Sequence, residues 1–302
     1  MHRIAAIVMA MAGTAAVAAG QEPMRDLRLV PFTSATFGNT RTLRLLLPPG
    51  YDSPENRGRR YPVLYLNDGQ NLFEAATSTF TGREWRVDET VGELIAAGRI
   101  APLIVVGIDH AGRRERFREY FPWVDTFLSP PEPSPQGARY PAFLVDEVLP
   151  FIEARYRVAR DPEWRGIGGS SAGGLAAINA VVTRPGVFGR LLVESPSIYV
   201  DDAHILKAAA AVTTWPERMA LGAGTAEGPP RVCDPRETAE PEVVTDLRRF
   251  TAVLRRAGVA DARIRLTVVP CATHDEGAWA ARLPGALAFL YAQPVGSTQH
   301  RR

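Results

Sequence analysis

The run Gly168-Gly169-Ser170-Ser171-Ala172-Gly173-Gly174 contains the pattern Gly-x-Ser-x-Gly, with Ser171 as its central serine. Glycine and serine are common residues, so a chain of this length matches the pattern by chance in about one case in ten. The surroundings make the match more specific, because a short strand is expected over 164–168 and a helix over 172–182. A sharp turn between a strand and a helix exposes a serine side chain.

Glycines on both sides of such a turn let the strand and the helix approach each other closely. We therefore predict that Ser171 is a nucleophile and that Ser170, at the variable position of the pattern, supports it without attacking. The alternative is a glycine-rich turn that carries no chemistry.

A serine hydroxyl needs a histidine that takes its proton and an acid that orients the histidine. After a serine of this kind the acid comes next along the chain and the histidine last. His274 directly follows the last expected strand, 264–269, and is the predicted base. The other four histidines are less suitable. His2 lies in the N-terminal segment, His300 lies in the C-terminal tail, and His110 precedes the serine. His204 follows the serine too closely to leave room for an acid on an intervening strand.

Glu227 is the first carboxylate after the strand that is expected to begin near residue 219, and it is the predicted acid. Asp234, farther along the same loop, and Glu194, after the strand 189–193, are the alternatives. Each of the three could instead be a solvated surface carboxylate.

The oxyanion of an ester-cleaving intermediate needs preorganised N–H donors. One is expected from the backbone of Ala172, directly after the nucleophile. The other is expected from the turn after the strand 61–66, where Gln70 is the predicted donor and Asp68 shapes the turn. An ordinary Asn-Asp-Gly turn is the alternative for this segment.

Apolar strand patterns alternate with helical patterns along the rest of the chain, which indicates an α/β fold. We predict one α/β-hydrolase domain, with a mostly parallel central sheet, helices on both faces and no separate lid domain. A long proline-containing polar loop is expected over 110–139. The remaining predicted strands are 28–37, 41–47, 103–108 and 189–193, and the remaining predicted helices are 85–97, 142–156, 243–257 and 277–291.

The N-terminus combines two basic side chains with an apolar, alanine-rich stretch, which is typical of a secretory signal peptide. We expect a signal peptide over 1–20, the catalytic domain over 21–294, a flexible tail over 295–302, and a periplasmic or secreted protein without a membrane span. An uncleaved anchor is the alternative. In an oxidising compartment two cysteines permit a disulfide, and the hypothesis is a Cys233–Cys271 bridge between two active-site loops, against two free thiols.

Composition argues against several other classes of function. A formal net charge of +2, with both signs mixed along the chain, gives no case for nucleic-acid binding. The sequence has no His-Glu-x-x-His, no paired Cys-x-x-Cys and no calcium-loop spacing, and its glycine-rich segments lack the lysine of a phosphate loop. We therefore expect no metal and no cofactor.

Several segments together resemble the putative esterase family, which is similar to esterase D and related to feruloyl and acetylxylan esterases, siderophore (enterochelin-type) esterases and mycolyltransferases. They occur in a shared order between about residues 30 and 292, and they are Tyr61-Pro-Val-Leu-Tyr-Leu-Asn-Asp-Gly-Gln-Asn-Leu-Phe73, Glu119-Tyr-Phe-Pro122, Phe143-Leu-Val-Asp-Glu-Val-Leu-Pro150, residues 169–174, Ser195-Pro-Ser197, and His274-Asp-Glu276 with Trp279.

The resemblance implies an α/β-hydrolase domain without a metal cofactor. It also implies Ser171 as nucleophile, Glu227 as acid, His274 as base, and the amides of Ala172 and Gln70 as oxyanion donors. Asn67 departs from the histidine that many relatives carry before Asp-Gly, at a position expected to be structural. Some siderophore esterases in this group lack a conventional acid.

The sequence thus predicts an exported carboxylic ester hydrolase that acts through an acyl-enzyme on a small-molecule or carbohydrate-linked ester. The alternatives are a siderophore trilactone esterase, an acyltransferase on the same scaffold, and a catalytically inactive hydrolase-fold binding protein. The arginines and aromatic residues of the loop 110–139 suit an acidic or aromatic acyl group, unless that loop is a solvated surface. The candidates for substrate contact are Asp68, Trp123 and Ser170.

Overall fold

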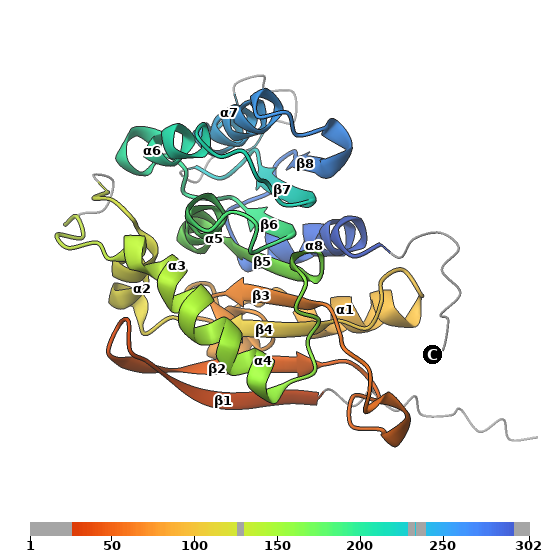
Figure 1. The fold of residues 1–302 in the computed structure, drawn as a ribbon. Coiled ribbons are helices and arrows are strands. Elements are labelled where there is room, and N and C mark those ends of the chain that lie inside the picture. The colour runs from red at the N-terminus through yellow and green to blue at the C-terminus, as the bar shows by residue number, and fades with distance from the viewer. Residues whose placement is uncertain (1–25, 126–129, 229–232, 234–239, 293–302) are drawn as a thin grey trace, which may run out of the picture.

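The structure is a computed structural model that describes residues 26–125, 130–228, 233 and 240–292. Its centre is an eight-stranded sheet in the order β1-β2-β4-β3-β5-β6-β7-β8 (Figure 1). β2 pairs antiparallel with both β1 and β4, and every pair from β4 to β8 is parallel. The strands are β1 (Asp26–Ser34), β2 (Asn39–Leu47), β3 (Val63–Asn67), β4 (Ile104–Ile108), β5 (Arg165–Ser170), β6 (Arg190–Glu194), β7 (Arg218–Gly224) and β8 (Ile264–Val269).

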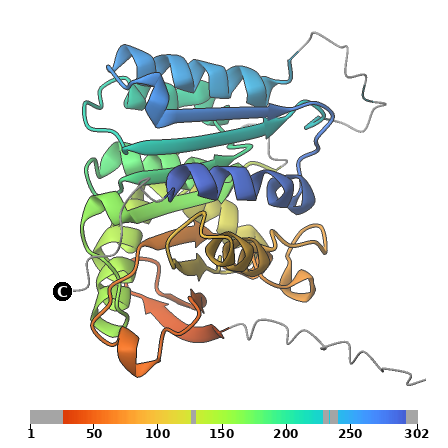
Figure 2. The same ribbon diagram turned by 90° about the vertical axis from the view of Figure 1, so that its right-hand side faces the viewer.

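Helices cover both faces of the sheet. α1 (Val87–Ala96) and α8 (Glu276–Leu290) pack together on one face, which is turned toward the viewer in Figure 2. The opposite face is covered by α3 (Tyr140–Ala142), which continues through a π-helical segment (Phe143–Val148) into α4 (Leu149–Arg155), and by α5 (Ser171–Thr183), α6 (Val200–Ala209) and α7 (Glu242–Arg256). Short 3-10 turns occupy Pro54–Asn56, Gly69–Asn71, Ala75–Thr77, Gly137–Arg139, Pro162–Trp164 and Asp261–Arg263.

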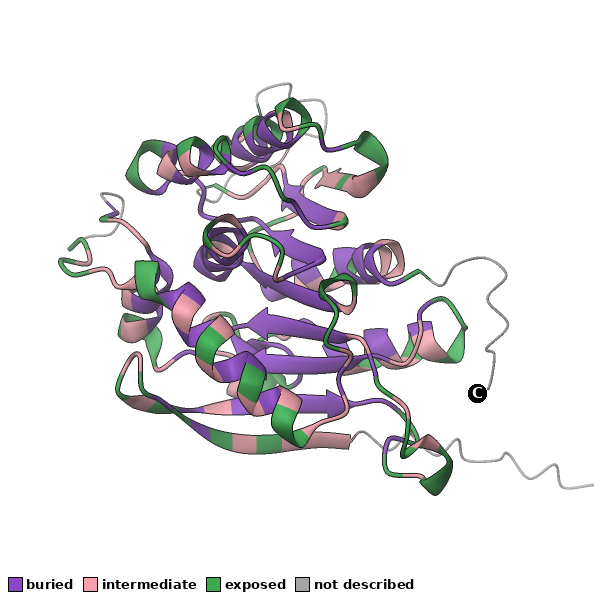
Figure 3. Cartoon of the chain, viewed as in Figure 1, coloured by how far each residue is buried: buried purple, intermediate pink, exposed green. Residues whose placement is uncertain are grey.

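The apolar runs of the central strands follow from this double cover. Successive side chains of a strand point to opposite faces, so Val63 and Tyr65 of β3 join one hydrophobic core while Leu64 and Leu66 join the other. Figure 3 shows the middle strands buried throughout and the green, exposed positions gathered on the outer sides of the helices. The predicted mostly parallel sheet with helices on both faces is confirmed.

Two helices were not predicted from the sequence. The expected polar loop over 110–139 contains α2 (Arg113–Tyr120), whose sequence Arg-Arg-Glu-Arg-Phe-Arg-Glu-Tyr has no apolar stripe. Buried polar contacts to other elements hold this helix, and hydrophobic periodicity does not register such contacts. α6 begins with a left-handed turn over Asp201, Asp202 and Ala203, a backbone conformation that hydrophobic periodicity does not predict. The predicted signal peptide (1–20) and tail (295–302) lie outside the described residues.

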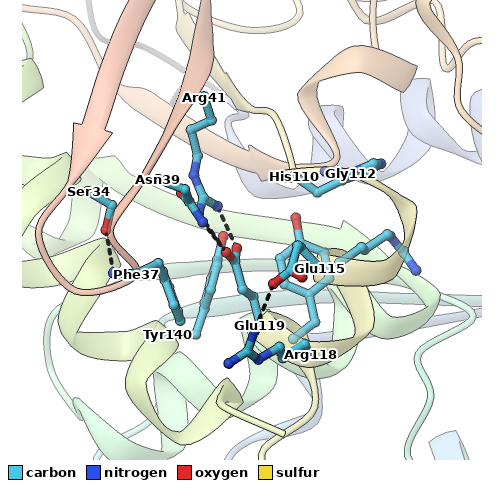
Figure 4. Close-up of polar contacts among 12 residues, drawn as sticks. Ser34, Phe37, Asn39, Arg41, His110, Gly112, Glu115, Arg118, Glu119 and Tyr140 are labelled. Atoms are coloured by element: carbon cyan, nitrogen blue, oxygen red, sulfur yellow. Dashed lines mark hydrogen bonds and ion pairs between the residues drawn. The ribbon is translucent and has the colours of Figure 1, made fainter. Parts of the chain in front are cut away.

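A buried ion pair attaches α2 to the antiparallel side of the sheet (Figure 4). Arg41 Nη1 of β2 lies 2.8 Å from Glu119 Oε2 of α2, and both side chains are almost completely enclosed. Asn39 Nδ2 donates to the same carboxylate at 2.7 Å, and the Arg41 guanidinium lies 4.6 Å from the centre of the Phe143 ring. The pair therefore joins two segments that are far apart in the sequence.

Replacing Glu119 by Gln should lower the free energy of unfolding by about 3–5 kcal/mol, because Arg41 is left as an uncompensated buried charge. Denaturant titration of the purified variant measures this. Asp146→Asn is the matched control, since Asp146 pairs with Arg184 at 2.9 Å on the surface and should cost at most about 1 kcal/mol. The double variant Arg41→Leu/Glu119→Leu should recover part of the loss. Equal losses in Glu119→Gln and Asp146→Asn would contradict this assignment.

Candidate active site

Ser171 stands at the junction of β5 and α5 with a left-handed backbone, φ 53°. This conformation is strained for a serine, and it turns the chain sharply between strand and helix. The two glycines of the motif are required by space. A Cβ on Gly169 would lie 2.7 Å from the Gly173 carbonyl oxygen, and a Cβ on Gly173 would lie 2.8 Å from Asp68 Oδ2. The sequence therefore builds the expected tight turn around Ser171.

The predicted acid and base are hydrogen-bonded to each other. His274 Nδ1 lies 3.0 Å from Glu227 Oε2, with the His274 side chain 41% exposed and that of Glu227 fully enclosed. Glu227 Oε1 accepts from Ser195 Oγ at 2.6 Å and from the backbone N–H of Gly224. This geometry fixes one edge of the imidazole ring, which is what an orienting acid does for a base.

Ser171, Glu227 and His274 line one cleft of about 740 Å³. The loops after β5, β7 and β8 bring the three together, because the carboxyl ends of parallel strands lie at the same edge of the sheet. The rest of the lining mixes hydroxyl groups with apolar side chains and one further carboxylate, from Ser195, Pro196, Ser197, Tyr199, Thr225, Gly228, Pro241, Glu242 and Val243.

The predicted oxyanion donors lie on two neighbouring segments. The N–H of Ala172 is in the first turn of α5, where backbone donors have no acceptor within the helix. Gln70 lies in the 3-10 turn after β3, and its side chain exchanges hydrogen bonds with the backbone of His110 at 3.3 and 3.1 Å. The oxyanion role of both amides stays a prediction.

Arg116 of α2 connects the Gln70 turn to the Ser171 turn. Its Nε and Nη2 donate to the two Asp68 carboxylate oxygens at 2.7 Å each, and Nη2 also reaches the Ser170 carbonyl at 3.4 Å. Asp68 itself is left-handed, φ 60°. Asn67 Nδ2 donates to the Gly173 carbonyl at 2.7 Å, so Asn67 holds the start of α5.

His110 is a poor candidate for the base. Burial, together with the charge of Arg116, lowers its pKa to about 4, against an opposing effect of Asp68. Its Nδ1 accepts from the Gly112 N–H at 3.0 Å, and its Nε2 lies 3.1 Å from Thr79 Oγ1. The ring is therefore neutral, and both of its nitrogen atoms have partners within the fold.

The alternatives for the acid do not pair with His274 in the described part of the chain. Burial raises the pKa of Glu194 to about 7, with Arg282 opposing, and Arg282 Nε donates to it at 2.6 Å. Asp234 lies outside the described residues.

The three predicted substrate contacts are not among the described residues that line the cleft. Asp68 gives both carboxylate oxygens to Arg116, and Ser170 is buried at the end of β5. Trp123 stacks on His204 with ring centres 4.3 Å apart. Their role as substrate contacts stays a prediction.

No role was predicted for Ser195, Ser197 or Trp279, although all three lie in segments that carry the family resemblance. Ser195 and Ser197 line the cleft, and Trp279 Nε1 donates to Ser195 Oγ at 3.0 Å. The position of the Ser-Pro-Ser segment, directly after the strand that ends at Glu194, was the feature of the sequence that could have indicated a role for these serines.

The loops that carry Glu227 and His274 are fastened to each other. Thr225 N–H donates to Val269 O at 3.0 Å, Ala226 N–H donates to Ala272 O at 3.0 Å, and Cys271 N–H donates to Thr225 Oγ1 at 2.9 Å. The structure also joins Cys233 and Cys271 in a disulfide. Backbone hydrogen bonds and a disulfide thus hold the loop of the acid against the loop of the base.

Residues 34–290 match the family described as "Putative esterase", and the chain belongs to this family. It is 25% identical over 256 residues to the uncharacterized protein YbbA of Bacillus subtilis, covering 84% of this chain and 93% of that protein. The siderophore enterobactin esterase of Emericella nidulans is 30% identical over 164 residues, 51% of this chain and 52% of that protein.

An endo-1,4-beta-xylanase/feruloyl esterase of Xylanibacter ruminicola is 29% identical over 169 residues, 54% of this chain and 20% of that protein. The fold is similar to that of the siderophore hydrolase EstB from Aspergillus nidulans, with TM-score 0.68 and 20% identity, over 88% of this chain and 94% of that one. The likeness to this solved structure confirms the α/β-hydrolase architecture.

Replacing Gly173 by Ala should lower the free energy of unfolding by about 1–3 kcal/mol, because the new methyl group meets an Asp68 carboxylate that Arg116 holds in place. Ester hydrolysis should fall with it. Urea titration and an activated aryl ester measure the two effects. Gly92→Ala in α1 is the control: nothing lies within 4 Å of its Cβ, so it should stabilise by roughly 0.5–1 kcal/mol. Equal stability of the two variants would show that Gly173 is not sterically required.

Proposed function

We propose that this protein is a serine carboxylic ester hydrolase that works through an acyl-enzyme, with Ser171 as nucleophile, His274 as base and Glu227 as orienting acid. The observation that carries the proposal is the hydrogen-bonded Glu227–His274 pair on the same cleft as a left-handed Ser171. Membership of the esterase family supports the same reaction class.

In this mechanism His274 takes the proton of Ser171 as the serine oxygen attacks the ester carbonyl carbon. The backbone amides of Ala172 and Gln70 stabilise the oxyanion, and collapse of the intermediate expels the alcohol, which receives the proton from His274. Water then attacks the acyl-enzyme with His274 again as base, which releases the acid and restores the Ser171 hydroxyl. Glu227 accepts the hydrogen bond from His274 Nδ1–H and holds the ring in place throughout.

The described lining favours an aromatic or hydroxylated acyl group over an acidic one. Pro196, Pro241 and Val243 provide apolar surface, while Ser197, Tyr199 and Thr225 provide hydroxyl groups. Among the described lining residues none is an arginine or lysine, and Glu242 adds a negative charge. Of the α2 arginines, Arg116 pairs with Asp68 and Arg118 with Glu115. We therefore propose a small-molecule or carbohydrate-linked ester of an aromatic acid, a class that agrees with the feruloyl esterase name of one relative.

Export is part of the proposal, on the basis of the signal-like segment 1–20 and of the Cys233–Cys271 disulfide, a bond typical of oxidising compartments. No helix among the described residues is long and apolar enough to cross a membrane.

Wild-type protein should give a pre-steady-state burst of phenolate from an activated aryl ester, one equivalent per active site, because acylation by an activated ester is faster than hydrolysis of the acyl-enzyme. Ser171→Ala should abolish the burst and lower kcat/KM by at least about 10³-fold. Stopped-flow absorbance measures both, and feruloyl esters, acetylated sugars and catecholate siderophore esters then rank the substrates. A burst that survives in Ser171→Ala refutes the nucleophile, and full activity in Glu227→Gln together with its loss in Asp234→Asn refutes the acid.

Protein recovered from the exported fraction should begin near Gln21 and contain no free thiol when denatured without reductant. Reduction should lower its free energy of unfolding by about 2–4 kcal/mol, because the disulfide restricts the unfolded chain. N-terminal sequencing, thiol titration and denaturant titration measure these quantities. The Cys233→Ser/Cys271→Ser variant is the control and should not respond to reductant. Two titratable thiols in the unreduced protein would contradict the disulfide.

A further inference from the structure

Ser195 stands behind the predicted acid at the end of β6. Its Oγ donates to Glu227 Oε1 at 2.6 Å, and its backbone N–H donates to the Gly222 carbonyl at 2.7 Å. The residue is buried and left-handed, φ 48°. A non-glycine residue holds such a conformation only where its surroundings enforce it. The strained backbone places the hydroxyl against the carboxylate.

Trp279 of α8 determines the direction of that hydroxyl. Its Nε1 donates to Ser195 Oγ at 3.0 Å, and Arg282 Nη2 reaches the same oxygen at 3.5 Å. A serine hydroxyl has one proton to donate, and an indole N–H can only donate. With its oxygen accepting from Trp279, Ser195 directs its own proton to Glu227.

The same tryptophan also touches the predicted base. The ring of Trp279 meets the His274 ring edge to face, with centres 5.2 Å apart and an interplanar angle of 83°. Trp85 also packs against Trp279, with ring centres 5.7 Å apart. Trp279 therefore contacts His274 directly and reaches Glu227 through Ser195.

A buried arginine compensates the charges around this network. Arg282 Nη2 lies 3.9 Å from Glu227 Oε1, and Arg282 Nε donates to Glu194 at 2.6 Å. One guanidinium is thus shared between two buried carboxylates, of which only Glu227 contacts His274.

From these contacts we propose that Ser195 and Trp279 are positioning residues for Glu227. The chain Trp279 Nε1–H to Ser195 Oγ–H to Glu227 Oε1 fixes the carboxylate so that its other oxygen, Oε2, holds His274. The inference rests on the proposed function, since positioning of Glu227 affects turnover only if the Glu227–His274 pair is catalytic.

Trp279→Phe tests the proposal, because it removes the N–H and keeps an aromatic ring beside His274. We expect kcat on an activated aryl ester to fall roughly 10-fold with KM unchanged. A loss of this size corresponds to the free energy of one hydrogen bond in a chain that ends on a charged group. Trp85→Phe is the matched control: it removes an indole from the same cluster without touching Ser195, and kcat should stay within about two-fold. A loss in Trp279→Phe no larger than in Trp85→Phe would overturn the proposal.

A double-variant cycle adds a readout that a purely structural role would not give. Ser195→Ala should lower kcat about as much as Trp279→Phe, and the double variant should lose little more, because Trp279 acts through Ser195. Losses that multiply in the double variant would show two independent effects and contradict the chain.

Proton NMR separates failure of this inference from failure of the proposed function. The downfield signal of the His274 Nδ1–H, identified by its loss in His274→Ala, should shift or broaden in Trp279→Phe and Ser195→Ala and stay in place in Trp85→Phe. An unchanged signal in Trp279→Phe overturns the positioning role, whatever the turnover. A wild-type protein without Ser171-dependent hydrolysis of the activated ester overturns the proposed function alone.

Discussion

The close approach of backbone around Ser171 is the constraint on which the site depends. A side chain at Gly169 would meet Gly173, and a side chain at Gly173 would meet Asp68. Only with hydrogen atoms at both positions can β5, α5 and the turn after β3 meet at one point. That meeting gives Ser171 its left-handed, half-buried position on the cleft and brings the Gln70 turn beside the first turn of α5. Arg116 then fastens the assembly by binding Asp68 and the Ser170 carbonyl.

The other half of the site depends on parallel strand order. β6, β7 and β8 are neighbours in the sheet, so the residues that follow them lie at one edge. Ser195 after β6 contacts Glu227 after β7, and Glu227 contacts His274 after β8. α8 then begins beside His274 and returns Trp279 to Ser195. Four segments separated by up to 84 residues thus close a ring of contacts around one carboxylate.

The sequence was sufficient for those parts of the molecule that leave a local pattern. Apolar runs gave the strands and the sheet type, and Gly-x-Ser-x-Gly between a strand and a helix gave the Ser171 turn. Chain order gave Glu227 and His274, which the structure brings together. It was insufficient where long-range polar contacts decide the structure. α2 has no apolar stripe and is held through Arg116 and Glu119. The pairing of Asp68 with Arg116 and the burial of Ser170 likewise leave no local pattern in the sequence. The role of Ser195 needs Trp279 and Glu227 in space, which no spacing along the chain expresses.

Among the buried ion pairs of the described residues, three act on segments that the site depends on: Arg116–Asp68, Arg41–Glu119 and Arg282–Glu194. Burying such pairs costs desolvation energy that their attraction only partly offsets, so well-packed apolar residues would stabilise the fold as well or better. Apolar contacts are non-directional, however, and would not fix a turn or a carboxylate in one orientation. Each pair here acts where orientation matters: Arg116 on the Gln70 turn, Glu119 on the helix that carries Arg116, and Arg282 beside Glu227. The placement of buried charge therefore follows the need for a rigid site.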